Sequence, residues 1–155
     1  MEHNNLISDS VMAKGVFSAW LIQSDSLLVI AGRRIDNLIV NEGKKWLAAR
    51  AAGSTGQQNL TAIAVGTGNA APVVGDTALS SQLASASLVR VPWQGFGTDS
   101  HKIFARAFFD TDEAVGTLAE AGLFFGSVLF SRVLISPTIS KPSGSILVCQ
   151  WEISF

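Results

Sequence analysis

The stretch "SILVCQWEISF", residues 145–155, decides the class of the fold, because from Cys149 onward it alternates between apolar and polar side chains. Successive side chains of a β-strand point to opposite faces. One face then collects the apolar positions Leu147, Cys149, Trp151, Ile153 and Phe155, and the other carries Gln150, Glu152 and Ser154. The pattern predicts a half-buried strand whose apolar face belongs to the core.

Similar strand signals recur along the chain and are separated by pieces rich in Gly, Pro, Ser or Asp. They fall at residues 16–23, 27–40, 60–68, 85–91, 102–109, 121–125 and 128–135. This spacing predicts a mainly β fold, an antiparallel β-sandwich of the jelly-roll kind, that occupies residues 15–155 as a single domain. Residues 1–14 are polar and lack a period, so we expect a flexible N-terminal arm.

One short α-helix is predicted near residues 41–52, in the stretch "NEGKKWLAARAAG". Asn41 is the expected N-cap and Gly53 the residue that closes the helix. Trp46 is expected to pack beside the face formed by Leu47 and Ala51. A second short helix or turn is expected over residues 76–84.

Composition limits the classes of function. Of the 155 residues, 48% are hydrophobic and only 15% are charged, so we expect another protein to cover part of the apolar surface. A net charge of -1 argues against nucleic acid and against an anionic membrane surface as partners. The longest apolar run, residues 121–130, is too short to span a bilayer, and the N-terminus does not resemble a signal peptide. A soluble protein is predicted.

The stretch "TAIAVGTGNAAPVVGDTAL", residues 61–79, raises the question of a phosphate-binding loop. Gly66, Gly68 and Ala71 match the pattern G-x-G-x-x-A after an expected strand. A dinucleotide site needs a helix to follow this pattern and an acidic residue about 20 positions further on. Pro72 and two valines follow instead, and the acidic residue is lacking. We therefore interpret the segment as a turn that ends a strand.

Other candidates for chemistry are weaker still. Asp110, Asp112 and Glu113 could offer oxygen ligands to a cation, but a solvated loop is the simpler reading, and whether they bind a metal stays open. The lone Cys149 falls on an apolar strand face and is expected to be a buried, inert thiol in a reducing cytoplasm. Glu120 and Glu152 could form an acid/base pair only if the fold brought them together. No catalytic, cofactor or metal residue is predicted, and the protein is not expected to be an enzyme.

A long segment of low charge is the best candidate for a contact with another subunit. Between Arg50 and Arg90 the only charged residue is Asp76, although small residues that fill a tight strand and its loops explain this composition equally well. The interface candidates are Ala70, Pro72, Val74, Leu79, Leu83, Trp93 and Phe96. Trp93 and Phe96 could also stack on a sugar ring, although such aromatic residues more often anchor a core or an interface.

Three phrases together suggest a family: "RIDNLIVNEGKKWL" (residues 33–47), "AVGTGNAAPVVGDTAL" (residues 64–79) and "LAEAGLF" (residues 118–124). With the terminal "WEISF", their order and spacing resemble small virion structural proteins of tailed bacteriophages. The resemblance covers residues 33–155, and members of the family are described as tail fibre, baseplate or capsid-associated proteins.

The resemblance implies a β-sandwich module without enzyme activity, made in the host cytoplasm and located in the virion. We expect a capsid decoration, or cement, protein that binds the major capsid protein as a homotrimer and stabilises the shell. The alternative is a tail fibre or baseplate attachment module that contacts a host glycan or another tail protein. No cofactor, nucleic acid or membrane partner is implied.

Overall fold

The computed structural model describes residues 13–89 and 101–155, which form eight strands and one helix. The elements are β1 (Lys14–Gln23), β2 (Val29–Ile39), α1 (Asn41–Ala51), β3 (Ala62–Gly66), β4 (Gln82–Ser87), β5 (Lys102–Phe109), β6 (Gly116–Phe125), β7 (Val128–Lys141) and β8 (Ser145–Ser154). The mainly β class is confirmed. Strand β1 already begins at Lys14, and residues 1–12 of the expected arm lie outside the described residues.

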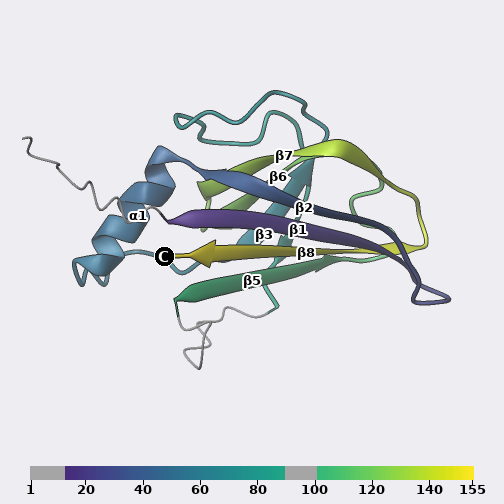
Figure 1. Ribbon diagram of the computed structural model, residues 1–155, viewed down its shortest axis with the longest axis horizontal. Helices are drawn as coiled ribbons and strands as arrows, with labels where there is room; N and C mark the ends of the chain where they lie inside the picture. The colour runs from purple at the N-terminus through teal and green to yellow at the C-terminus, as the bar shows by residue number, and fades with distance from the viewer. Residues whose placement is uncertain (1–12, 90–100) are drawn as a thin grey trace, which may run out of the picture.

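The eight strands form one antiparallel sheet in the order β4-β3-β6-β7-β2-β1-β8-β5 (Figure 1). Strand β2 joins its two halves, because it pairs with β1 along most of its length and with β7 only at Leu38 and Ile39. The sheet rolls until its two edge strands approach each other. Beyond β4, the amide of Val89 donates a hydrogen bond of 3.0 Å to the carbonyl of Arg106 in β5.

The structure is therefore a nearly closed, barrel-like sheet, and the two separate sheets of a sandwich or jelly roll are not confirmed. The physical reason is the continuity of hydrogen bonding through β2, which leaves no break at which two layers could separate. Strand spacing along the sequence is the same in both architectures, so the sequence pattern does not distinguish them.

The alternation in the last strand is confirmed. Leu147, Cys149, Trp151 and Ile153 of β8 are all buried in the core. Phe155 is the exception: it follows the end of β8, and 48% of its surface is exposed. It lies at the rim of the sheet, beyond the last position that the core covers.

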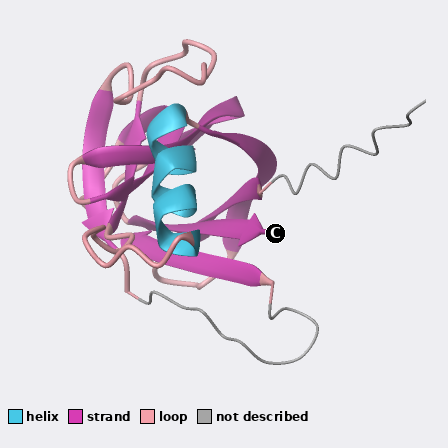
Figure 2. Ribbon diagram, turned by 90° about the vertical axis from the view of Figure 1, so that its left-hand side faces the viewer, coloured by secondary structure: helices cyan, strands magenta, loops and turns pink. Residues whose placement is uncertain are grey.

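Helix α1 lies across one end of the rolled sheet (Figure 2). The Trp46 ring packs edge-on against Phe130 with 5.6 Å between centroids, and its centroid is 6.0 Å from that of Phe125.

The predicted end of the helix at Gly53 is confirmed by the left-handed backbone of this residue, with φ of +78°. The expected cap at Asn41 is wrong, because the N-cap is Val40 and no side chain caps the helix. Among the described residues, no helix has the length and apolar character needed to cross a membrane.

Gly43 lets the first turn of α1 come unusually close to β7. A Cβ atom at this position would collide with the backbone carbonyl of Phe130. The same carbonyl accepts a hydrogen bond of 3.1 Å from the amide of Val40, so it is held in place. The helix can therefore seat against the end of the sheet only with glycine here.

We predict that Gly43→Ala lowers the free energy of unfolding by about 1–3 kcal/mol, because the added methyl group must push the helix off a fixed carbonyl. Gly56→Ala is the matched control: nothing lies within 4 Å of its Cβ position, and its stability should be unchanged or slightly higher. Urea unfolding followed by circular dichroism measures both. Equal stability of the two variants would contradict the close packing of α1 on β7.

Candidate functional site

The loop between β3 and β4, residues 67–81, lies over the outer face of β6 and β7 and is called the covering loop (Figure 1). The second helix or turn expected over residues 76–84 is not present: an irregular loop continues to Ser81 and strand β4 follows. Leu79 is buried beneath the loop, close to the outward position of Gly122. The covering loop therefore adds a second layer on this side of the sheet.

Glu120 of β6 binds the backbone of the covering loop. Its side chain has no exposed surface. Its Oε1 accepts hydrogen bonds from the amides of Gly68 (3.1 Å) and Ser81 (2.6 Å). Its Oε2 accepts one from the amide of Ser80 (2.9 Å). One buried carboxylate thus holds both ends of the loop.

Arg132 of β7 completes this buried cluster. Its guanidinium is 2% exposed and donates to Glu120 Oε2 through both Nε (3.2 Å) and Nη2 (2.8 Å). It also donates to Asp76 Oδ2 (2.7 Å), to the carbonyl of Ala70 (2.9 Å) and to Ser80 Oγ (2.8 Å). The guanidinium therefore joins the middle of the covering loop to the carboxylate that holds its ends.

The charge state of the cluster follows from these contacts. Burial opposes ionisation of Glu120, but the amides of Ser81 and Ser80 together with Arg132 bring the pKa of its carboxyl below the ordinary value. Burial likewise opposes the charged form of Arg132. The hydrogen bonds and negative charges of Asp76 and Glu120 have the larger opposite effect, so the pKa of Arg132 is raised. The ionised Glu120 therefore adds stability at neutral pH, and this contribution is lost as the pH falls through the lowered pKa.

These contacts answer the question of a phosphate site at residues 61–79. Backbone amides that converge on one point can bind an anion, but here the anion is the protein's own Glu120 carboxylate. A Cβ atom at Gly66 or Gly68 would collide with that carboxylate, which explains both glycines. The segment is a strand followed by a loop, as predicted, and its glycines make room for an internal ion pair.

The interface candidates divide according to their burial. Ala70 and Val74 are exposed on the covering loop, Leu83 is exposed on β4, and Pro72 is half-buried. Leu79 is buried and packs inside the chain. Trp93 and Phe96 lie outside the described residues. Asp76, the only charge between Arg50 and Arg90, is paired with Arg132, so the surface of the covering loop carries little free charge.

The other candidates for chemistry are separated in the fold. Glu152 is on the outer face of β8, 3.3 Å from the ammonium of Lys102, whereas Glu120 is enclosed beneath the covering loop. Cys149 is buried as predicted, and burial raises the pKa of its thiol. Asp110 and Glu113 accept hydrogen bonds from backbone amides of their own loop. Within residues 13–89 and 101–155, no group of three or more His, Cys, Asp or Glu side chains is placed to hold a metal ion.

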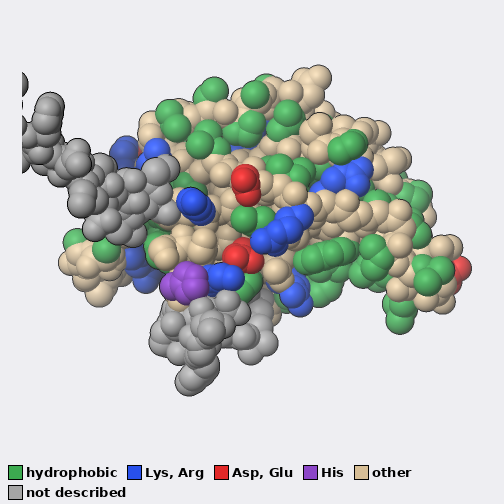
Figure 3. Space-filling model, viewed as in Figure 1, with side chains coloured by type: hydrophobic (Ala, Val, Ile, Leu, Met, Phe, Trp, Pro, Cys, Tyr) green, Lys and Arg blue, Asp and Glu red, His purple; other side chains and the backbone are tan. Residues whose placement is uncertain are grey.

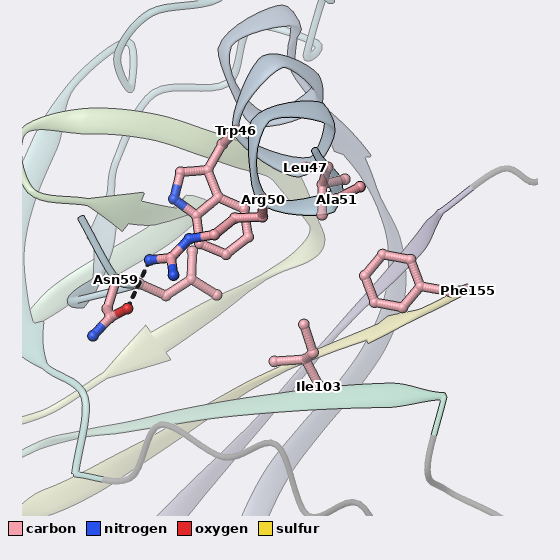
Figure 4. A pocket seen from close by; sticks show the side chains of 8 residues that line it. Trp46, Leu47, Arg50, Ala51, Asn59, Ile103 and Phe155 are labelled. Carbon is pink, nitrogen blue, oxygen red and sulfur yellow. Dashed lines mark hydrogen bonds between the residues drawn. The ribbon is translucent and has the colours of Figure 1, made fainter. Parts of the chain in front are cut away.

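A surface pocket of about 400 Å³ opens where α1 meets the ends of β5 and β8 (Figure 4). Leu47 and Ala51 face Ile103 and Phe155 across it. Its polar side is formed by Arg50, whose guanidinium carbon lies 5.0 Å from the centroid of the Trp46 ring.

The polar groups of this pocket are engaged with one another. Arg50 donates to Asn59 Oδ1 at 2.7 Å and to the carbonyl of Gln57 at 2.9 Å. The indole N–H of Trp46 donates to the carbonyl of Gln58 at 2.7 Å. These bonds secure the segment after α1 to the helix, so the pocket is mainly an apolar hollow.

The fold and the buried cluster define a class in structural terms: a nearly closed antiparallel sheet of eight strands, with a loop held to its outer face by an internal ion pair. Comparison of the chain with protein-family models, with curated proteins and with solved structures found no match.

We predict that Arg132→Met lowers the free energy of unfolding by about 3–5 kcal/mol, because it leaves the Glu120 carboxylate buried without its counterion. Lys45→Met is the control: it removes an exposed cation whose pair with Glu42 should contribute less than about 0.5 kcal/mol. Urea unfolding at neutral pH measures the difference. Similar small losses in the two variants would contradict a structural role for the cluster.

Proposed function

We propose that this chain is a non-enzymatic structural protein of a tailed bacteriophage, and that it decorates the outer surface of the capsid. The observation that carries the proposal is the covering loop, a rigid surface segment of low charge. Its single carboxylate, Asp76, is neutralised by Arg132, and its backbone amides are held by Glu120. The resemblance in sequence to small virion proteins supports the same assignment.

Rigidity matters for such a contact because a docking surface that is already ordered loses little conformational entropy on binding. The covering loop is fixed at both ends and in the middle, and the amide of Asn41 at the start of α1 donates to the carbonyl of Val74 at 2.8 Å. The exposed side chains of Ala70 and Val74 are therefore presented in one arrangement. This arrangement suits an apolar contact with the major capsid protein.

The proposed mechanism is burial of apolar area at a contact that is repeated over the shell. Each buried Å² of apolar surface contributes about 25 cal/mol. A single copy gains little after the cost of association is subtracted. Many copies that each bridge neighbouring capsid subunits together oppose the outward pressure of packaged DNA.

We predict that gold-labelled antibodies against this chain bind densely over the heads of intact particles of the phage that encodes it. Electron microscopy of labelled particles is the measurement, and particles from a phage lacking the gene are the control. Label confined to the tail would overturn decoration in favour of attachment. Absence of label from every part of the particle would overturn a place in the virion.

A substitution on the covering loop links this result to the proposed surface. Val74→Asp places a charge on the exposed apolar side of the loop and should reduce labelling of heads. Ser127→Asp adds the same charge at the exposed β6–β7 turn and should leave labelling unchanged. Equal labelling with both variants would show that another surface makes the contact.

A further inference from the structure

The outer face of β2, β1, β8 and β5 is divided into a polar half and an apolar half. Strand pairing places outward side chains in rows that run across the four strands. The polar half holds a mixed row, Asp36–Val16–Glu152–Phe104, and a polar row, Arg34–Ser18–Gln150–Arg106. The apolar rows are Gly32–Trp20–Val148–Phe108 and Val29–Ile22–Ile146.

The apolar half continues into the turn between β1 and β2. Residues 27–30 read "LLVI", and all four side chains are at least half exposed, with Leu27 at 74% and Leu28 at 62%. Phe108 of β5 is 43% exposed on the same face. Figure 3 shows hydrophobic side chains gathered toward this end of the face and charged ones nearer its middle and opposite end. Contiguous exposed apolar side chains of this kind are typical of an interaction site.

Leu27 adds a second observation. Its backbone is in the left-handed region, with φ of +56°, where a bulky side chain costs free energy and glycine does not. The amide of Leu27 donates to the carbonyl of Gln23 at 2.8 Å, so the turn is closed in this form. A leucine at this position is favoured neither by its conformation nor by burial within the chain, and its side chain extends the exposed apolar surface of the turn.

The two outer faces of the sheet differ in how they are covered. The covering loop shields the face of β6 and β7, where Leu79 fills the space above Gly122. Over the apolar half of the other face, no described segment lies in front of the side chains in Figure 3. This half therefore remains open to another molecule.

The distribution of charge around the apolar patch indicates which kind of molecule binds there. On one side lies the row that carries Arg34 and Arg106. Arg34 lies 4.0 Å from the Glu152 carboxylate of the next row, and Arg106 donates to Gln150 Oε1 at 3.1 Å. On the other side lies a rim with four exposed carboxylates, those of Asp25, Asp110, Asp112 and Glu113. One buried cation, Lys141, offsets part of their charge and donates to the carbonyl of Asp110 at 2.8 Å, so the rim is acidic on balance. Hydrogen bonds join the two loops of this rim through Gly144: Ser24 donates to its carbonyl at 2.6 Å, and its amide donates to Thr111 at 3.0 Å.

An apolar centre with a basic row on one side and an acidic rim on the other is complementary to a copy of itself. We propose that this face binds a second copy of the chain, as a two-fold pair in which the strands of the two copies run antiparallel across the contact. The two-fold axis lies in the contact and crosses the strands at the apolar rows. Each copy then places Arg34 against the partner's β1–β2 turn and Arg106 against the partner's acidic loop, because a two-fold contact repeats the same patch on both sides.

The test is sedimentation velocity of the purified full chain over a concentration series. The chain should sediment as a dimer, and Phe108→Asp should weaken the dimer at least about tenfold, because Phe108 is 43% exposed in an apolar row that the axis crosses. Phe108→Leu keeps an apolar side chain and should leave the dimer intact. Ser127→Asp adds the same charge at the opposite end of the sheet and should also leave it intact.

Charge reversal tests the orientation. Asp25→Lys and Arg34→Glu should each weaken the dimer, because each creates a like-charge contact, and the double variant should restore it. A trimer, a chain that stays monomeric at every concentration, or a dimer that Phe108→Asp does not weaken would each overturn the proposal. A monomer that floats with uncharged phosphatidylcholine vesicles would also overturn it, in favour of a lipid surface.

Discussion

The buried pair of Glu120 and Arg132 is the constraint on which the outer layer of this structure depends. Moving a carboxylate and a guanidinium out of water costs free energy. The buried pair is stable inside a protein only when nearly every polar atom of the two groups has a hydrogen-bond partner. The covering loop supplies those partners, through three amides for Glu120 and the carbonyl of Ala70 for Arg132. The loop is therefore as fixed as the strands beneath it, although it has no regular secondary structure of its own.

This cluster also makes the two outer faces of the sheet different from each other. On β6 and β7 the covering loop lies over the outward side chains, and its only charged residue, Asp76, is paired with Arg132. On the face that includes β1 and β5, Phe108 is 43% exposed and Trp20 is partly exposed. The proposed capsid contact uses the covered face, and the proposed contact between two copies uses the open apolar face.

Local pattern predicted the elements well but did not predict their long-range pairing. The alternation around Trp151 and the helix that begins at Asn41 depend on neighbouring residues, and both are present. The two halves are joined into one sheet by the short pairing of β2 with β7 at Leu38 and Ile39, which no local pattern signals. A single sheet therefore replaced the expected sandwich.

The Glu120–Arg132 pair was missed for a related reason. Gly126, with φ of +59°, forms a tight turn between β6 and β7 and places the two charges on one face of a hairpin. The register shift between Leu123 and Phe124 changes which residues lie opposite each other, so counting from the turn gives only an approximate pairing. Two opposite charges flanking the apolar run of residues 121–130 were the available signal.

Amide hydrogen exchange with residue resolution tests the central claim most directly. The account predicts that the amides of Gly68, Ser80 and Ser81 exchange as slowly as those of β3 and are unaffected by inorganic phosphate; fast exchange that phosphate slows would contradict it and would show that these amides await an external anion.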